Sequence, residues 1–220
     1  MENIIIELSP DDARHLLRVL CQTHARGKDL DVSEKVEKAI RIQLSTISPD
    51  IVLFKNFIVE HKSLFEQTMN SCDWDKSMNA RWTASFGVPY EYNGMEYPVR
   101  PFPEFMTKII EEISATIIGL NPNNCLINLY HNGESSMGFH SDNLDQLVEG
   151  TGVAIISLGS TRTLRYKNKI YKDNIHDYEL KSGSLVYMDD DVQAEWLHAI
   201  PKCETTEPRI SLTFRQLKTK

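Results

Sequence analysis

Apolar residues near the start of the chain recur with the period of a helix. Ser9 and Pro10 supply an N-cap and a proline at the first helical position, and the periodic pattern stops near Gly27. A second helix is predicted to begin after Ser33. The apolar stripe of the first helix consists of Ala13, Leu16, Leu17, Leu20 and Cys21. We therefore predict a helical hairpin over residues 1–47, whose stripe serves either internal packing or docking of a protein partner or a second copy of the chain.

The middle of the chain mixes short β-type runs with amphipathic helices. Ile51–Phe54 reads as a strand, and the apolar spacing predicts helices over Val59–Met69 and Phe105–Leu120. Residues 81–103 are rich in aromatic side chains and turn formers, and Asn93-Gly94 is a strong hairpin signal. This segment is either an ordinary two-stranded ribbon or an aromatic lid over a pocket for a planar substrate.

From residue 125 to the end, short β-type runs alternate with Gly, Asn, Asp and Pro. The predicted strands are Cys125–Tyr130, Val153–Leu158, Thr163–Tyr166, Ser184–Met188, Trp196–Ile200 and Ile210–Phe214. Such a series favours a sandwich or barrel, and its number of strands suits a jelly roll. We therefore predict a mainly β fold with flanking helices (α+β), in which a double-stranded β-helix (jelly-roll) core follows the N-terminal helical hairpin.

Length and charge limit the class of protein. The 220 residues, 41% hydrophobic and 25% charged, suit one globular domain with an appendage. The formal net charge is −7 and the sequence pI is about 5.5. A general nucleic-acid coat protein would be basic, so any binding of nucleic acid must depend on a local patch.

The expected compartment follows from what the sequence lacks. No apolar run approaches the roughly 20 residues that span a bilayer, and Met1-Glu2-Asn3 has no basic signal-peptide region. The four cysteines have no CxxC spacing, so we interpret them as free thiols: Cys21, Cys72, Cys125 and Cys203. We expect a cytoplasmic protein, or a nuclear one if the source is eukaryotic.

The sharpest chemical signal is a His-x-Asp pair in the β-rich part. His140 and Asp142 are two residues apart on an extended segment, which directs both side chains to one face. His198, 58 residues after His140, is available as a third ligand. Two imidazoles and one carboxylate form the facial triad of non-haem Fe(II) oxygenases, which leaves metal positions open for co-substrate and O2.

Two further strands carry polar pairs. Asn128 and Tyr130 share one strand face about ten residues before His140. Arg209 and Arg215 are six residues apart, which also places them on one face, about 20 Å apart on a fully extended strand. The guanidinium fork suits a carboxylate, and burying it without such a partner is costly.

These features together resemble one family. The motifs Asn128-Leu129-Tyr130, His140-Ser141-Asp142, Ser157-Leu158-Gly159, His198 and Arg209-x5-Arg215 occur in the order and spacing of the AlkB-type Fe(II)/2-oxoglutarate dioxygenases. The resemblance covers about Ile51 to Arg215 and is densest from residue 125 onward. It implies a dioxygenase domain over 51–220 with a jelly-roll core at 123–216, after a helical N-terminal extension over 1–47.

The resemblance assigns roles to the motif residues. It implies that His140, Asp142 and His198 ligate Fe(II), with 2-oxoglutarate and O2 as co-substrates. Arg215, helped by Tyr130, would pair with the distal C5 carboxylate of 2-oxoglutarate, and Arg209 would hold the C1 end beside the metal. The other co-substrate contacts implied are Asn128 and Ser211, the latter at a position where several members carry Asn.

Residues 81–103 also resemble the nucleotide-recognition lid of the nucleic-acid repair members. Arg81, Phe86-Gly87, Tyr90, Tyr92 and Gly94 fall where that lid carries its own motif. The substrate contacts implied by the resemblance are Arg81, Phe86, Tyr90, Tyr92 and Trp196. The implied partner is DNA or RNA that contains alkylated bases.

One position departs from this pattern. The repair members usually carry an acid shortly after the metal-binding Asp, whereas here that position is Leu144, with Asn143 or Asp145 as the available substitute. Glu134, Asp145 and Glu149 are predicted to make this rim acidic, which disfavours phosphate.

A basic run follows in the β-rich part. It contains five cations and no acid: Arg162, Arg165, Lys167, Lys169 and Lys172. The run is either a solvated hairpin or a patch that contacts phosphate.

Three hypotheses follow for the function. The first is a dioxygenase that hydroxylates N-alkyl groups on nucleic-acid bases, so that dealkylation releases aldehyde, succinate and CO2. The second is the same chemistry on a small-molecule metabolite or a protein side chain, which the acidic net charge favours. The third is a binding module with a degenerate site, against which the complete set of metal and arginine residues argues.

Overall fold

The computed structural model describes residues 48–92 and 94–219, so the predicted hairpin over 1–47 lies outside the described residues. Two compact units divide the chain: Met1–Ser48 with Lys167–Ile175, and Pro49–Tyr166 with His176–Lys220. In the first unit, Asn168 closes a turn by accepting from the backbone N–H groups of Ile170 and Tyr171. Among the described residues, the second unit contains the helices and most of the sheet structure.

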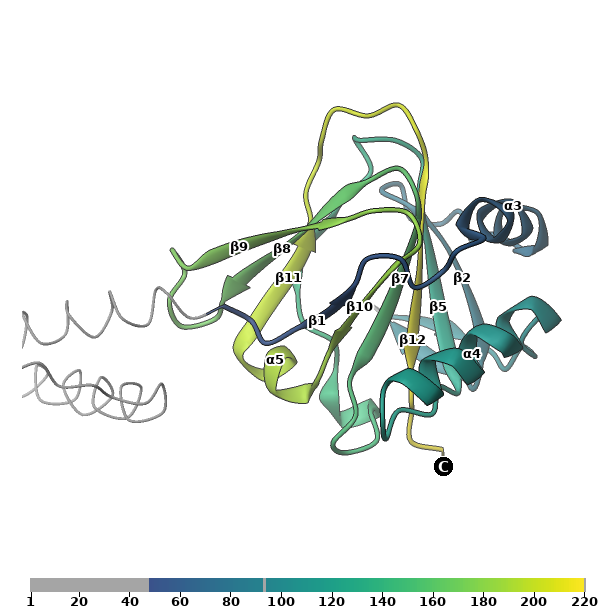
Figure 1. The fold of residues 1–220 in the computed structure, drawn as a ribbon, viewed down its shortest axis with the longest axis horizontal. Coiled ribbons are helices and arrows are strands. Elements are labelled where there is room, and N and C mark those ends of the chain that lie inside the picture. Colours follow the sequence, from purple (N-terminus) through teal and green to yellow (C-terminus); the bar gives the residue numbers. More distant parts are fainter. Residues whose placement is uncertain (1–47, 93, 220) are drawn as a thin grey trace, which may run out of the picture. The chain divides into compact units, whose positions relative to one another are not determined.

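The second unit is built on a six-stranded antiparallel sheet, the major sheet (Figure 1). Its strands are, in spatial order, β1 (Val52–Phe54), β10 (Ser184–Met188), β7 (Val153–Gly159), β12 (Arg209–Arg215), β5 (Asn124–Tyr130) and β2 (Trp82–Gly87). A four-stranded minor sheet has the order β6 (Met137–His140), β11 (Trp196–Ile200), β8 (Arg162–Asn168) and β9 (Ile175–Leu180). The predicted mainly β fold is confirmed, and the two sheets are consistent with a jelly roll.

Helices and short elements complete the unit. The helices α3 (His61–Ser71) and α4 (Glu104–Thr116) pack on one face of the major sheet (Figure 1). A small hairpin consists of β3 (Tyr90–Tyr92) and β4 (Met95–Tyr97), and the short helices are η1 (Leu144–Gln146) and α5 (Asp190–Glu195). No helix of the described part of the chain is both long and apolar enough to cross a membrane. Cys72, Cys125 and Cys203 are free thiols, as predicted, and Cys21 lies outside the described residues.

Strand alternation decides which side of the major sheet each side chain occupies. On β12, Ile210, Leu212 and Phe214 are fully buried in the hydrophobic core beneath α3 and α4. The intervening positions of β12 carry Arg209, Ser211, Thr213 and Arg215, which line a cavity on the opposite face. Because side chains alternate along a strand, one strand supplies both the core and a polar wall.

The segment 81–103 is not a single lid. Its first part forms β2, which pairs along its length with β5 and so belongs to the major sheet. Only the β3–β4 hairpin and its flanks project from the sheet as a separate ribbon. Phe86, predicted to contact substrate, is 4% exposed and belongs to the hydrophobic core with Ile113 and Phe214. This prediction was wrong because alternation along β2 turns Phe86 towards the helices.

The hydrophobic pattern missed several elements, among them α5 and β9. The helix α5 has only six residues, which is too short to show a helical period. Strand β9 (Ile-His-Asp-Tyr-Glu-Leu) has largely exposed or half-buried side chains and carries few strand-forming residues.

A core role for Phe86 predicts a loss of stability when its side chain is truncated. Phe86→Ala should lower the free energy of unfolding by about 3–5 kcal/mol, because the cavity adds to the lost burial. Phe139→Ala, at a side chain that is 39% exposed, should change it by less than about 1 kcal/mol. Urea unfolding measures both, and equal values for the two variants would contradict the placement of Phe86.

Candidate functional site

A narrow cavity of about 30 Å³ lies between the two sheets. The major sheet contributes alternate residues of β5 and β12, and the minor sheet contributes residues of β6, β8, β9 and β11. Its polar lining consists of Asn128, Tyr130, His140, Asp142, His198, Arg209, Ser211, Thr213 and Arg215. Every residue predicted to hold iron or 2-oxoglutarate therefore lines this one cavity.

The three predicted iron ligands are neighbours in space. His198 on β11 pairs directly with His140 on β6, and their ring centroids are 4.2 Å apart. The Nε2 atom of His198 lies 4.0 Å from Oδ2 of Asp142. Within the described residues, however, no group of three His, Cys, Asp or Glu side chains already has the arrangement of a formed metal site. The fold thus brings the three candidate ligands together in one cavity.

The chemistry of the three side chains fits a ferrous ion. Nδ1 of His140 lies 2.9 Å from the carbonyl oxygen of Gly138. A carbonyl oxygen can only accept, so Nδ1 carries the proton and Nε2 is the nitrogen left to bind a metal. Metal-binding histidines usually donate their second ring N–H in this way. With His198 and a buried carboxylate beside it, the donor set is that of the two-histidine, one-carboxylate sites.

Asp142 is held by partners from two other elements. Its Oδ1 accepts hydrogen bonds from Nε and Nη2 of Arg215, both residues being buried. Its Oδ2 accepts from Nε2 of Gln193 at 3.1 Å. Burial alone would raise the pKa of the Asp142 carboxyl, but the positive charge of Arg215, with His198 and His140, lowers it below its ordinary value. The carboxylate is therefore kept ionised, as metal binding requires.

Arg215 has an aromatic neighbour on its outer side. Its guanidinium lies 4.9 Å from the ring centroid of Tyr90, a distance at which a cation is attracted to the ring face. Tyr90 is itself buried and belongs to β3. The β3–β4 hairpin thus contacts the site through the arginine that holds Asp142.

Arg209 is buried in a different environment. Its Nε donates to Oγ of Ser157 at 2.8 Å, and its guanidinium lies 5.1 Å from the Tyr130 ring centroid. In the described part of the chain it has no acidic partner, and its buried Nη1 has no hydrogen-bond acceptor. Burial lowers the pKa of Arg209 to about 10, so the side chain is still charged at neutral pH. A buried guanidinium with an unused N–H group fits a ligand carboxylate.

A wider cleft of about 570 Å³ adjoins the narrow cavity, and the two share Met137, His140 and Asp142. Two predicted substrate contacts line the cleft, Arg81 and Tyr90. Arg81 is buried and donates from Nε to Oδ1 of Asn128 at 2.8 Å. The remaining lining residues are Met78, Glu91, Gly138, Phe139, Ser141, Asn143 and Gln146.

The other predicted substrate contacts do not line this cleft. Phe86 is a core residue on the opposite face of the major sheet. Trp196 is buried and contacts His176 edge-on, with ring centroids 5.6 Å apart, and it lines neither the cavity nor the cleft. Tyr92 belongs to β3, but its side chain lies outside the described residues.

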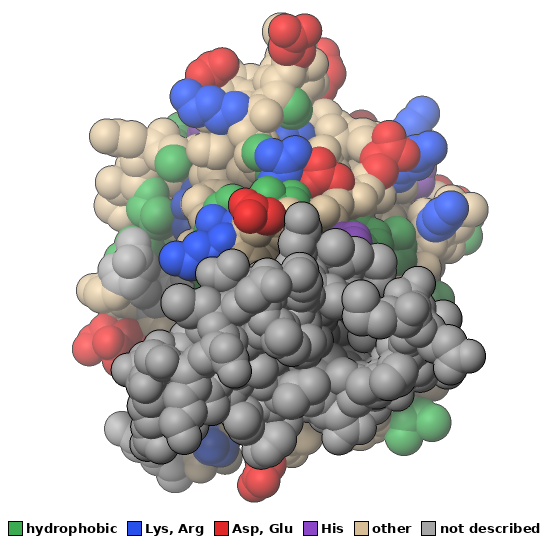
Figure 2. All heavy atoms as spheres, turned by 90° about the vertical axis from the view of Figure 1, so that its left-hand side faces the viewer, with side chains coloured by type: hydrophobic (Ala, Val, Ile, Leu, Met, Phe, Trp, Pro, Cys, Tyr) green, Lys and Arg blue, Asp and Glu red, His purple; other side chains and the backbone are tan. Residues whose placement is uncertain are grey.

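The basic run is in part structural. Arg162 is buried and donates to the backbone carbonyls of Asn132, Ser135 and Pro201. Arg165 forms a two-pronged ion pair with Asp177. These two cations are therefore engaged within the protein. On the face seen in Figure 2, Lys and Arg side chains are interspersed with Asp and Glu over its described part.

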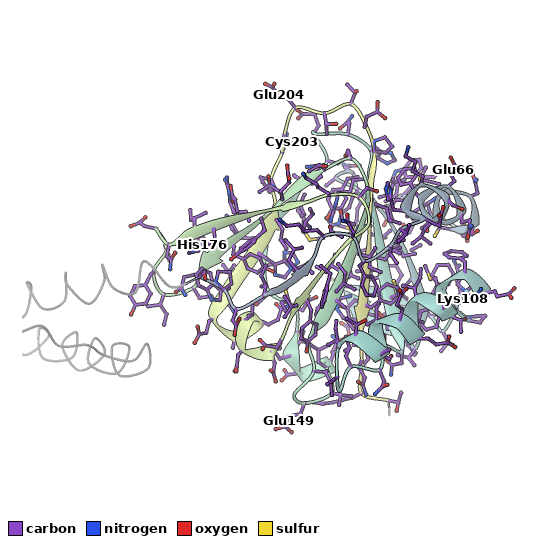
Figure 3. All side chains as sticks on the ribbon, viewed as in Figure 1. Glu66, Lys108, Glu149, His176, Cys203 and Glu204 are labelled. Atoms are coloured by element: carbon purple, nitrogen blue, oxygen red, sulfur yellow. The ribbon has the colours of Figure 1, made fainter. Side chains whose placement is uncertain are left out.

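The acidic residues expected at the rim also lie elsewhere. Glu134 pairs with Lys202, their Oε2 and Nζ atoms being 2.9 Å apart. Glu149 points away from the sheets at the end of its loop (Figure 3). Neither residue lines the cleft, and nor does Asp145; the acid found there besides Asp142 is Glu91. None of the three residues on which the predicted acidic rim rested lines the cleft: Glu134 lies on the loop between β5 and β6, and Asp145 and Glu149 follow Asp142 in the chain.

Comparisons with known proteins show the family to which the chain belongs. The family model of the 2OG-Fe(II) oxygenase superfamily matches residues 45–215. The chain therefore belongs to the 2OG-Fe(II) oxygenase superfamily. Ferrous ion and 2-oxoglutarate are part of the family's description, which confirms the predicted cofactors.

Within this superfamily, the relatives most informative about the chain are of the AlkB type. Alpha-ketoglutarate-dependent dioxygenase alkB homolog 3 of Bos taurus is 30% identical over 175 residues, which cover 71% of this chain and 61% of the relative. DNA oxidative demethylase ALKBH2 of Bos taurus is 26% identical over 60% of this chain and 50% of the relative. The chain thus matches between half and about three-fifths of these two relatives, and the expected AlkB-type resemblance is confirmed.

Two further similarities are less informative about chemistry. Uncharacterized protein R406 of Acanthamoeba polyphaga mimivirus is 31% identical over 71% of this chain and 81% of that protein. The solved structure of OsALKBH1 superposes with a TM-score of 0.57 at 18% identity, covering 77% of this chain and 99% of that one. This second similarity shows a shared fold.

Exchanging each arginine for methionine should separate their structural roles. Arg215→Met leaves the Asp142 carboxylate buried beside no guanidinium, so the free energy of unfolding of the metal-free protein should fall by about 3–5 kcal/mol. Arg209→Met removes a buried charge that has no acidic partner, so the change should stay within about 1 kcal/mol. Urea unfolding without metal or 2-oxoglutarate measures both, and a larger loss for Arg209→Met would refute this assignment.

Proposed function

We propose that the chain is an Fe(II)/2-oxoglutarate-dependent dioxygenase that hydroxylates N-alkyl groups on nucleic-acid bases and so removes them. The observation that carries the proposal is the junction of two spaces. A narrow cavity with the arginine pair and an adjoining cleft meet at His140 and Asp142. Co-substrate and substrate would therefore reach the same reactive centre from different sides.

His140, Asp142 and His198 would hold the ferrous ion. When bound with 2-oxoglutarate and O2, the ion supplies the power to insert oxygen into a C–H bond, with succinate and CO2 as by-products. The protein keeps Asp142 ionised through Arg215 and keeps His140 in the required tautomer through the Gly138 carbonyl. The remaining requirements, namely orientation of the substrate and exclusion of water, fall to the walls of the cleft.

The arrangement of the arginines supports a reversal of the co-substrate ends expected from sequence. Arg215 contacts Asp142, so it would face the carboxylate of 2-oxoglutarate that lies beside the metal. Arg209 lies at the other end of β12, opposite Tyr130, with Ser157 at its Nε. Its unused Nη1 would take the distal carboxylate. Because residues six apart on an extended strand are about 20 Å apart, the two arginine side chains would have to lean towards each other within the cavity to hold both ends of a five-carbon diacid.

The cleft suits a planar substrate with an alkyl group. Phe139 is 39% exposed at its wall, Met78 and Met137 add apolar surface, and Arg81 adds a positive charge. An exposed aromatic ring offers a base a stacking surface, and an arginine offers contacts to phosphate or to a base edge. The bovine relative named as a DNA oxidative demethylase supports the same substrate class.

The same chemistry on a metabolite or a protein side chain is the second candidate. The net charge of −7, the mixed charges in Figure 2, and the internal engagement of Arg162 and Arg165 favour it. Salt separates the two candidates. Turnover of an oligonucleotide should fall steeply with ionic strength because binding releases counterions, whereas turnover of a neutral small molecule should not.

The proposal is tested with the Fe(II)-loaded protein, 2-oxoglutarate and N-methylated single- and double-stranded oligonucleotides. Formaldehyde and succinate should form in equal amounts, and His140→Ala should abolish both. Arg209→Met should raise the KM for 2-oxoglutarate about 10-fold or more, because a charge-assisted hydrogen bond is worth about 1.5–3 kcal/mol. Arg165→Met, the same exchange at an exposed ion pair, is the matched control and should leave this KM unchanged.

The outcomes separate the hypotheses. Succinate without formaldehyde from any oligonucleotide, but stimulated by a metabolite or peptide, would favour the second candidate. Failure to convert 2-oxoglutarate at all would refute both and would favour a binding module.

A further inference from the structure

Gln193, a residue that no sequence motif singled out, holds the candidate metal-binding carboxylate at two points. Its Nε2 donates to Oδ2 of Asp142 at 3.1 Å, and its Oε1 accepts from the backbone N–H of Asp142 at 3.0 Å. The orientation of the amide follows from chemistry, since a carboxylate oxygen can only accept and a backbone N–H can only donate. Gln193 therefore fixes both the side chain and the backbone of Asp142.

The two oxygens of Asp142 are assigned to different partners. Arg215 takes Oδ1, whereas Oδ2 faces both the Gln193 amide and Nε2 of His198, the latter at 4.0 Å. The oxygen that faces a second candidate ligand is the one positioned to bind the metal. Gln193 thus contacts the metal-facing oxygen itself and limits rotation of the carboxylate about its bond to the chain.

Gln193 connects two segments of the chain that contribute to the site. Gln193 belongs to α5, which Asp189 caps by accepting from the backbone N–H of Val192 at 2.9 Å. The helix ends at Glu195 and β11 begins at Trp196, so His198 follows Gln193 by five residues. Asp142, by contrast, lies 51 residues earlier in the sequence. One amide therefore links the loop that carries Asp142 to the segment that carries His198.

Packing alone does not explain an amide at this place. Gln193 is 1% exposed, and a buried amide costs free energy unless both of its ends are hydrogen-bonded. An apolar side chain of the same length would fill the space without that requirement. An amide is useful here because it can hold a carboxylate in one orientation, as the hydrogen-bond partners of metal ligands commonly do.

We propose that Gln193 is a positioning residue that sets the metal affinity of the site by orienting Asp142. This inference rests on the proposed function, because it takes Asp142 to be a metal ligand. Gln193 lines neither the narrow cavity nor the wider cleft, so its effect should appear in metal binding and not in the binding of 2-oxoglutarate.

The test uses Co(II) as the metal probe with the full-length protein. Gln193→Met keeps the length of the side chain and loses both hydrogen bonds, and Gln193→Asn keeps the amide but withdraws it by one methylene group. Both variants should bind Co(II) about 10–100-fold more weakly than the parent, with altered d–d absorption bands. At saturating Co(II), their affinity for 2-oxoglutarate should stay within about 2-fold of the parent.

Gln67→Met is the matched control, because it makes the same exchange at an exposed glutamine on α3. It should bind Co(II) like the parent. Folded Gln193 variants that bind Co(II) within about 2-fold of the parent would overturn the inference, as would an equal loss in Gln67→Met. Loss of the fold in both Gln193 variants would also overturn it, since the role would then be structural. A parent protein that binds no Co(II) would instead refute the proposed function.

Discussion

The site depends on a carboxylate buried between two sheets. An ionised Asp142 in the interior is tolerated only because charged and polar donors replace its water. Arg215 supplies a charged donor from β12 of the major sheet, and Gln193 supplies a polar donor from α5, which leads into the minor sheet. The same contacts that satisfy Asp142 therefore tie the two sheets together where His140 and His198 meet. Stability and ligand placement share one set of hydrogen bonds.

Much of this arrangement is readable from sequence because strands alternate. The even spacing of Arg209 and Arg215, and of Asn128 and Tyr130, predicted two polar rows on single faces, and all four residues line one cavity. The motif order added the distant His198, which lies directly opposite His140. Period-two patterns and motif spacing are local properties, so a single sequence carries them.

The sequence alone did not show which side chains contact one another across the site. Arg215 was expected to serve only the co-substrate, yet it holds Asp142 across 73 residues of sequence. Gln193 gave no signal, since its role exists only through a contact 51 residues away. Phe86 was misplaced because the aromatic segment suggested a lid, whereas its pairing with β5 turns that ring into the core. Local patterns predict which face of a strand a side chain occupies, whereas the tertiary structure determines which residues that face contacts.

The two arginines of β12 differ in a way that bears on ligand binding. Arg215 already pairs with the Asp142 carboxylate, so a ligand that approaches Arg215 must share its guanidinium with Asp142. Arg209 has none, and its buried Nη1 is without an acceptor among the described residues. A buried cation in this state raises the free energy of the ligand-free protein, and an anion that enters removes that cost. The end of the cavity at Arg209 is therefore where a dicarboxylate gains most, and the Asp142 end is where it must fit around a pair already formed.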